Sequence, residues 1–375
     1  MDAIENLLAW AKTQGITINN VGPKALPGRG IGIVATSPIK KDDPILDVPI
    51  PCLKTIATVP KSIARLFPKD TAVHALLAAD IALDSSPSFG TWSAVFPTPE
   101  DISSCPLTWP APLASHLPPA ASSLLSAQRE KFESHWALAS AAALPADLGY
   151  EAYRHAWLLV NSRTFYHVTP RTAKRDKEDH MILQPVADLL NHASSGCAVA
   201  FDKESFTIRA ERDYAPGEEI HICYGRHSND FLLVEYGFVM GAGENEWDEA
   251  WLDDAVLPRL GAAHRKRLEE RGFLGKYVVD TETVCYRTQV ALRTLVLPAR
   301  KWLRFVDGFE DGEAEQAEVD GILREILAAY DEEISAKIEL VSGLREGEEV
   351  QRQMLVARWR QIQELVRGAL QKLKT

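Results

Sequence analysis

The sequence predicts an α+β protein in which two β-rich regions flank a helical insertion and a helical domain follows. Short runs rich in β-branched residues, punctuated by Gly and Pro, occupy 24–58 and return at 199–224. Between them, from about 60 to 160, apolar residues recur at helical spacing between Pro-rich loops. Ala, Leu and charged residues dominate after 245, which favours long helices.

The chain length of 375 residues allows two domains or one large decorated domain. We expect a first domain over residues 1–240, which contains the insertion, and an all-α domain over residues 241–375. The composition, 46% hydrophobic and 25% charged, is ordinary for a protein with a well-filled core.

The formal net charge of −11 argues against a nucleic-acid partner, because phosphate neutralisation needs clustered Lys and Arg. It is compatible with a basic protein partner. Five scattered cysteines without a Cys-x-x-Cys pair favour a reduced, intracellular protein without a structural zinc cluster. No stretch has the length of a membrane-spanning helix, so we expect no membrane partner.

Each β-rich region divides into short strands. In the first, Gly30 and Gly32 bracket Ile31, where the backbone can bend tightly or approach a ligand, and a second strand, "PILDVPI", follows the turn "KKDD". In the second, "AVAFD", "SFTIRA" and "EIHICYG" are strands, with a turn at Pro216-Gly217.

Helices are expected at both ends of the chain and in the insertion. "MDAIENLLAWAKTQG" has the spacing of a short amphipathic helix rather than a signal peptide. Residues 321–341 and 348–373 read as two long helices. The acidic stretch 307–320, with seven acids and no base, is interpreted as a solvated loop, with contact to a basic substrate as the alternative.

The pair Asn191-His192, with Cys197 five residues on, has three interpretations. A zinc site needs three or four ligands, and no second local pair accompanies this one, so we predict no metal. A nucleophilic site lacks both a Gly-x-Ser-x-Gly motif and a cue for activating Cys197. For His192 alone, a core histidine bonded to neighbouring backbone stays open.

Four segments read together resemble the SET-domain methyltransferases. They are "RGIGIVA" (29–35), "NSRTF" (161–165), "DLLNH" (188–192) and "CYGRHSNDFLLVEYGF" (223–238). The resemblance is to the branch typified by the Rubisco large-subunit lysine methyltransferase, with its long insertion and helical substrate-binding domain. It implies small SET β-sheets with a knot-like threading of the C-terminal segment, which is rare. That threading brings Asn191-His192 beside Tyr224.

The resemblance also implies S-adenosyl-L-methionine as cofactor and S-adenosylhomocysteine as product. Arg29 and Ile31 would flank the cofactor, although Arg29 replaces an acidic residue common in this branch. Backbone atoms of Asn191 and His192 would bind the adenine edge. Arg163 would lie close to the cofactor carboxylate, for which a guanidinium fork is suited; a surface salt bridge is the alternative. The cofactor set implied by the family is Arg29, Ile31, Ser162, Arg163, Asp188, Asn191, His192 and Tyr224.

By the same resemblance, the activity is methyl transfer to a protein lysine, with Tyr224 and Tyr236 as catalytic residues. The Tyr224 hydroxyl would orient the amine and the methyl group, together with main-chain carbonyls near Arg163 and Asp188. The lysine channel would be formed by Arg163, Phe165, Asp188 and Tyr236. A core aromatic with a satisfied hydroxyl is the alternative for each tyrosine.

The expected partner is a non-histone protein substrate, by analogy a ribosomal protein or a translation factor, and the expected protein is a cytoplasmic or nuclear monomer. The alternatives are a catalytically silent SET-fold binding module and a histidine methyltransferase. The histidine enzymes of this branch have a polar amide in the segment matching "SRTF" and lack the second tyrosine, whereas this chain has Phe165 and Tyr236.

Overall fold

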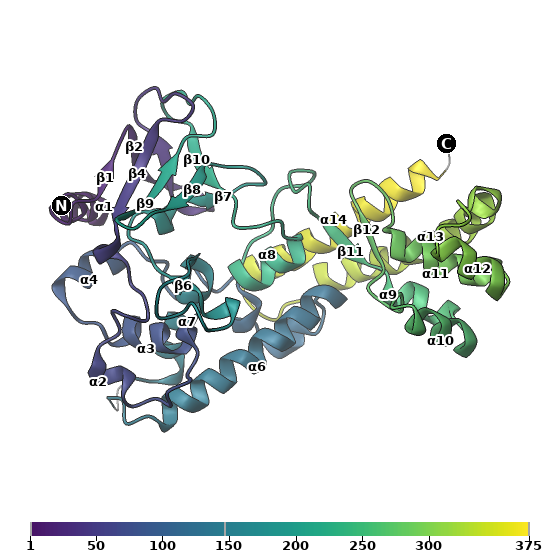
Figure 1. Ribbon diagram of the computed structural model, residues 1–375, viewed down its shortest axis with the longest axis horizontal. Helices are drawn as coiled ribbons and strands as arrows, with labels where there is room; N and C mark the ends of the chain where they lie inside the picture. The colour runs from purple at the N-terminus through teal and green to yellow at the C-terminus, as the bar shows by residue number, and fades with distance from the viewer. Residues whose placement is uncertain (1, 146–147, 374–375) are drawn as a thin grey trace. The chain divides into compact units, whose positions relative to one another are not determined.

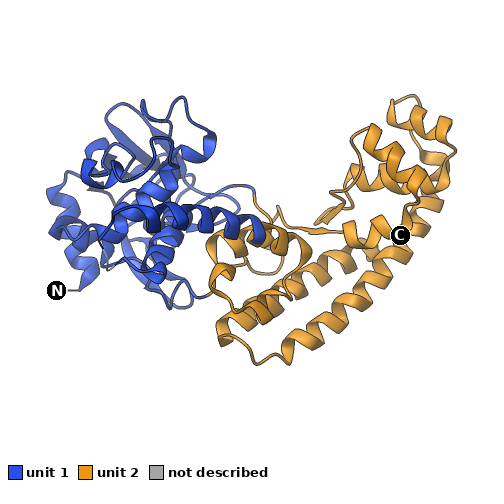
Figure 2. Cartoon of the chain, turned by 90° about the horizontal axis from the view of Figure 1, so that it is seen from below, with its two compact units in different colours: residues 1–103, 126–226 blue, residues 104–125, 227–375 orange. Residues whose placement is uncertain are grey.

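The computed structural model describes residues 2–145 and 148–373, and it is a mixed α+β structure, as predicted. The chain divides into two compact units, shown in different colours in Figure 2. Unit 1 comprises residues 1–103 and 126–226, and unit 2 comprises residues 104–125 and 227–375. Residues 104–125, which lie inside the predicted insertion, therefore group with the C-terminal helices.

Two four-stranded sheets form most of the β part of unit 1 (Figure 1). The first has the order β1-β4-β9-β8 and consists of β1 (Thr17–Ile18), β4 (Pro44–Pro49), β9 (Ser205–Arg209) and β8 (Ala198–Phe201). The second has the order β2-β3-β10-β7 and consists of β2 (Val21–Leu26), β3 (Gly30–Ala35), β10 (Glu219–Ile222) and β7 (Asn191–His192). A two-stranded sheet joins β5 (Phe165–Tyr166) to β6 (Met181–Ile182). The predicted strands are confirmed, and β3 and β4 belong to different sheets.

The strands form where β-branched and aromatic side chains can be buried on one face. Val48, Phe206, Ile208 and Ile220 are fully buried, and they alternate with more exposed neighbours. Burial of this kind fixes strand register, because a slip by one residue would turn these side chains outward.

One parallel pairing brings distant segments together. β7 runs parallel to β10, with Asn191 opposite His221 and His192 opposite Ile222. The loop after β7 then lies against β10, since the Cys197 amide donates to the His221 carbonyl at 2.8 Å. At Gly196 an added Cβ would lie 2.5 Å from the His221 carbonyl oxygen, so this close passage requires glycine. The knot-like threading itself stays a prediction.

Helices cover the remainder of unit 1. They are α1 (Ala3–Thr13), α2 (Lys61–Ala64), α3 (Val73–Leu83), α4 (Pro87–Ser93), α7 (Tyr150–Arg163) and most of α6 (Pro119–Ala141), with 3-10 turns η1 (Ile50–Cys52), η3 (Lys177–Asp179) and η4 (Ala187–Leu189). The predicted N-terminal helix and insertion helices are thus confirmed. α3 packs on α7, where the His74 ring stacks on Trp157 with centroids 4.1 Å apart.

Most of the polar loop 167–180 is exposed, but His180 departs from this pattern. His180 is buried, and its ring nitrogens lie 2.9 Å from the Thr172 carbonyl and 3.0 Å from the Tyr166 hydroxyl. His180 therefore belongs to the buried interior of unit 1, although the surrounding sequence is polar. The sequence carries no periodicity there that would report this burial.

Unit 2 is dominated by helices. It contains α5 (Ala111–Ala114), α8 (Asn229–Tyr236), α9 (Asp253–Val256), α10 (Ala262–Glu270), α11 (Tyr286–Val296), α12 (Ala299–Val306), α13 (Gln316–Ser342) and α14 (Glu349–Lys372), with 3-10 turns η2 (Pro106–Thr108), η5 (Leu257–Arg259) and η6 (Glu313–Glu315). The two long helices predicted at the C-terminus are α13 and α14, which pack together. The helical domain also contains a two-stranded antiparallel sheet, β11 (Glu249–Trp251) with β12 (Val278–Asp280), which an all-α description omits. Three-residue strands are too short to carry a period-2 signal.

The acidic stretch 307–320 is partly ordered into η6 and the first turn of α13, rather than being a loop throughout. Its carboxylates pair with nearby cations: Asp307 with Arg271, Glu310 with Arg304, and Glu315 with Lys301. These pairs are partly exposed and belong to unit 2.

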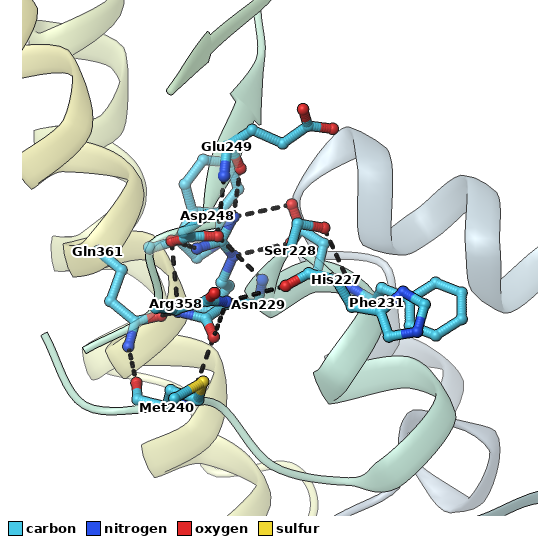
Figure 3. A network of polar contacts seen from close by, with 12 residues as sticks. His227, Ser228, Asn229, Phe231, Met240, Asp248, Glu249, Arg358 and Gln361 are labelled. Carbon is cyan, nitrogen blue, oxygen red and sulfur yellow. Dashed lines mark hydrogen bonds and ion pairs between the residues drawn. The ribbon is translucent and has the colours of Figure 1, made fainter. Parts of the chain in front are cut away.

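A buried charged network joins α8, β11 and α14 inside unit 2 (Figure 3). The Arg358 side chain is fully buried and pairs with Asp230 at 2.9 Å and Asp248 at 2.7 Å. Asn229 donates to Asp248 and to Gln361. Because buried charges must be paired and hydrogen-bonded, this network fixes the start of α8 against α14.

Candidate active site

The pairing of β7 with β10 places Tyr224 beside the Asn191-His192 pair. The Tyr224 amide donates to His192 Nδ1 at 3.0 Å, and the Tyr224 hydroxyl donates to the Leu190 carbonyl at 2.7 Å. The two rings lie 5.1 Å apart between centroids. His192 Nδ1 therefore acts as an acceptor, so a neutral ring carries its proton on Nε2.

A glycine turn lies against the same segment. β2 and β3 form a hairpin in which Gly30 has a φ of 69°. A Cβ added at Gly32 would lie 2.5 Å from Leu26 Cδ1, 2.8 Å from Asn191 Nδ2 and 2.9 Å from Glu219 Oε1. A Cβ at Gly30 would meet nothing within 4 Å. Gly32 thus allows close packing toward Asn191, whereas the backbone at Gly30 faces open space.

Glu219 joins the glycine turn to Asn191, and the sequence reasoning missed it. Its carboxylate accepts from Asn191 Nδ2 at 2.8 Å and pairs with Arg29 at 2.7 Å. Its side chain is 10% exposed, and His221 Nε2 lies 3.4 Å from it. Glu219 lies on β10, two residues before His221. This strand pairs with β3, which holds Gly32, and with β7, which holds Asn191. The sequence signal that could have found Glu219 was an acid within this predicted strand.

Arg163 and Asp188 form a largely buried ion pair. Arg163 ends α7, and Asp188 lies in η4. Arg163 Nε lies 3.2 Å from Asp188 Oδ2, and Nη2 donates to the Asp188 carbonyl at 2.6 Å. The side chains are 13% and 0% exposed, so this is not a surface salt bridge. Burial raises the pKa of the Asp188 carboxyl, although the Arg163 guanidinium opposes that shift.

Ser162, Phe165 and Ile31, which the resemblance also assigns to the site, contact neighbouring parts of the protein. Ser162 Oγ donates to the Leu158 carbonyl of its own helix at 2.8 Å. Phe165 packs edge-on against Phe206, with centroids 5.3 Å apart. Ile31 is half-buried opposite Ala25 in the hairpin. Their contacts with cofactor or substrate stay predictions.

Tyr236 belongs to unit 2. It ends α8, and Gly237 follows with a left-handed φ of 80°. The Tyr236 ring lies 6.4 Å from Phe231 and 6.3 Å from Phe238 between centroids. Its membership of the lysine channel stays a prediction.

Cys197 does not have the character of a reactive thiol. It is buried, its Sγ lies 2.8 Å from Glu211 Oε2, and burial raises its pKa to about 12. Across residues 2–145 and 148–373, no group of three or more His, Cys, Asp and Glu side chains has the arrangement of a metal site. In the same part of the chain, no helix is both long and apolar enough to cross a membrane.

The arrangement supplies positioning groups rather than a covalent nucleophile. Tyr224 donates its hydroxyl proton to Leu190, so toward a further group the oxygen acts as an acceptor. Carbonyl and hydroxyl acceptors beside a tight glycine turn are suited to orienting an amine and a polarised methyl group.

Comparison with known proteins decides the family. Residues 30–225, more than half of the chain, match the SET domain family. The chain belongs to the SET-domain family. Residues 252–372 of this SET protein match the Ribosomal lysine N-methyltransferase 2 C-terminal domain. The resemblance read from the four motifs is therefore confirmed.

Relatives of this SET protein include curated methyltransferases. It is 28% identical over 208 residues to Ribosomal lysine N-methyltransferase set11 of Schizosaccharomyces pombe, which covers 52% of this chain and 53% of that protein. It is 26% identical to Ribosomal lysine N-methyltransferase 2 of Saccharomyces cerevisiae over 52% of this chain and 45% of that protein. The chain thus spans about half the length of these two relatives. Similarity to human SET domain-containing protein 4 is 24% and covers 92% of this chain and 84% of that protein.

Solved structures confirm the fold. The structure of Rubisco LSMT bound to sinefungin and monomethyllysine aligns with a TM-score of 0.66 at 16% identity, and it covers 100% of this chain and 92% of that chain. At this level of identity the likeness concerns the fold alone.

Proposed function

We propose that this SET protein is an S-adenosylmethionine-dependent protein-lysine N-methyltransferase. The observation that carries the proposal is the Tyr224 hydroxyl bonded to the Leu190 carbonyl, next to the strand pair that holds Asn191 and His192. Family membership and relatives named as ribosomal lysine methyltransferases support it.

The residues of unit 1 fit the methyl donor. The backbone at Gly30 borders open space, so a ligand can approach it closely. Asn191 and His192 offer backbone and side-chain polar groups beside that turn, and Arg163 offers a guanidinium for a carboxylate. When bound, S-adenosylmethionine supplies a methyl group on a sulfonium, and the C–S bond breaks as the N–C bond forms.

Catalysis by this chain is positioning and exclusion of water. Tyr224 and the main-chain carbonyls orient the lysine amine for in-line attack. The amine must first lose a proton to solvent, and burial next to a positive charge lowers a lysine pKa in the required direction. A dedicated general base is then not needed. Tyr236, Phe165, Arg163 and Asp188 are proposed to line the lysine channel.

The region from residue 241 on is proposed to bind the protein substrate, and the region up to residue 240 to perform the transfer. We propose a ribosomal protein as the substrate class, since three relatives carry the name ribosomal lysine N-methyltransferase. We further propose that the enzyme acts as a monomer in the cytoplasm or the nucleus.

The decisive experiment supplies tritiated S-adenosylmethionine and ribosomal subunits, or a source-organism lysate, to the parent protein and to Tyr224→Phe. We expect labelled protein bands with the parent and loss of most label with the variant. Tyr150→Phe is the matched control, because it removes a surface hydroxyl that donates to Glu133 at 2.8 Å. If Tyr224→Phe labels like the parent, Tyr224 has no catalytic role; if the parent binds the cofactor but labels nothing, the silent binding module is favoured.

Histidine methylation is the second candidate. The chain is 23% identical to Actin-histidine N-methyltransferase of Xenopus tropicalis, over 71% of this chain and 47% of that protein. Phe165 and Tyr236 are the residues expected of a lysine enzyme. Mass spectrometry of the labelled band decides: methyl groups on lysine support the proposal, and methyl groups on histidine overturn it.

A further inference from the structure

An aromatic cluster on the helical insertion lies against the Arg163–Asp188 pair. The cluster consists of Phe89, Trp92 and Phe96, whose rings meet edge-to-face with centroids 5.6–5.9 Å apart. Two of its members contact the ion pair. Trp92 Nε1 donates to Asp188 Oδ2 at 3.2 Å, and Arg163 Cζ lies 5.5 Å from the centroid of the Phe96 ring.

These contacts are buried, which strengthens them. Trp92 is 2% exposed, and the Asp188 side chain is 0% exposed. In such surroundings a hydrogen bond or ion pair is stronger than in water, and losing one partner leaves the other unsatisfied. Trp92, which comes from α4, thus fixes the carboxylate that fixes Arg163.

The guanidinium is held at two of its three nitrogens. Nε faces the Asp188 carboxylate and Nη2 donates to the Asp188 carbonyl, which sets the plane of the fork. Among the residues that the structure describes, no acceptor bonds to Nη1. With 13% of its side chain exposed, Arg163 can reach a ligand from this fixed orientation.

We propose that Trp92 and the Asp188 carboxylate are positioning residues that orient the Arg163 guanidinium for the carboxylate of the methyl donor. The helical insertion then contributes to recognition of the amino-acid end of the cofactor, and not only to the core. This inference rests on the proposed function, because it assumes that the donor carboxylate binds at Arg163.

Two ligands that share an adenosine part separate this role from a general structural one. S-adenosylhomocysteine carries the amino-acid end, and 5′-methylthioadenosine lacks it. Calorimetry gives the Kd of each ligand, and its stoichiometry gives the folded fraction of every preparation. For Trp92→Phe, which keeps an aromatic ring, although a smaller one, and removes the N–H donor, we expect the Kd for S-adenosylhomocysteine to rise about 5-fold, or about 1 kcal/mol. The Kd for 5′-methylthioadenosine should stay within about 2-fold, because this ligand lacks the carboxylate that Arg163 would bind. The volume lost from indole to phenyl lowers stability, and the stoichiometry reports any loss of folded protein.

The controls use a second indole that donates to α4 and the acid of the same ion pair. Trp10→Phe, on α1, removes an indole N–H that donates to Ser88 on α4 at 2.9 Å rather than to Asp188, and should change neither Kd. Asp188→Asn is the second variant and should give the same selective loss. In an Arg163→Met background, Trp92→Phe should add nothing further, because the group that it positions is gone.

The outcomes are distinguishable. If Trp92→Phe and Asp188→Asn weaken both ligands equally, or strengthen S-adenosylhomocysteine because Asp188 competes with its carboxylate, the positioning role is wrong. If the parent protein binds neither ligand, the proposed function fails instead.

Discussion

Tyr224 donates its hydroxyl proton to the carbonyl oxygen of Leu190, 34 residues earlier in the chain, at 2.7 Å. A second bond, from the Tyr224 amide to His192 Nδ1, fixes the backbone of the same residue. The hydroxyl is thus oriented by the segment that leads into β7, which makes the oxygen an acceptor of defined direction.

Replacing Tyr224 with Phe tests this orientation in kinetic terms. We expect kcat to fall about 100-fold, as for the loss of one preorganised polar group at a reacting centre. The Kd for S-adenosylmethionine should change by less than about 3-fold, because backbone groups supply most of the proposed adenine contacts. Steady-state kinetics with calorimetry measures both. A rise in Kd with an unchanged kcat would instead make Tyr224 a binding residue.

Gly32→Ala tests the close approach between the glycine turn and Asn191. The new Cβ would lie within 3.0 Å of Leu26, Asn191 and Glu219, so these groups must shift. We expect cofactor Kd to rise about 10-fold and the free energy of unfolding to fall by about 1–3 kcal/mol. Gly321→Ala is the control: it lies inside α13 with open space around the added Cβ, and should stabilise by about 0.5–1 kcal/mol. Equal behaviour of the two variants would refute the close packing.

Several of these relationships were predictable from sequence and others were not. The motif "DLLNH" and Tyr224 were expected side by side, and the β7–β10 pairing places them so. The predicted long helices have a periodicity strong enough to read, such as the apolar face of α14.

The contacts of Trp92 and Arg358 could not be predicted, for a common physical reason. Each joins segments far apart in sequence: Trp92 bonds Asp188 96 residues away, and Arg358 bonds Asp230 128 residues away. Hydrophobic periodicity reports which face of an element is buried, not which polar side chain meets it there. Arginine is mostly exposed in proteins, so the residue type alone would place Arg358 at the surface, whereas it is fully buried.

Arg358→Met tests whether the buried network holds unit 2 together. Removing the cation leaves Asp230 and Asp248 buried without it, and we expect a loss of about 3–5 kcal/mol in the free energy of unfolding. Arg367→Met on the same helix is the matched control. Its pair with Asp331 is half-exposed, so the loss should be below about 1 kcal/mol. Chemical denaturation monitored by circular dichroism measures both, and similar losses would contradict a special role for the network.

The buried histidines at the α3–α6–α7 contact predict a pH-dependent stability. Burial lowers the pKa of His135 to about 4, and the nearby Lys131 adds to the shift. Burial also lowers the pKa of His74 well below its usual range. His135 Nδ1 accepts from Trp157 Nε1 at 3.0 Å, which requires that this nitrogen carries no proton. His74 Nε2 lies 2.9 Å from the Trp157 carbonyl; this bond favours the protonated ring, but burial outweighs it.

The unfolded chain, with a histidine pKa near 6.5, binds protons that the folded chain rejects between about pH 4 and 6.5. Stability is therefore fully present above about pH 6.5 and is lost as the pH falls toward 4. His135 alone should lower the free energy of unfolding by about 2 kcal/mol between pH 7 and pH 5, and His74 should add to this.

Denaturant titrations of the parent and of His135→Gln, at pH 8, 7 and 5, measure the effect. At pH 8 the difference in the free energy of unfolding between the two proteins reports packing only. At pH 5 the parent should have lost about 2 kcal/mol more than the variant relative to pH 8. A difference that stays constant across this range would show that His135 takes up its proton equally in the folded and unfolded states.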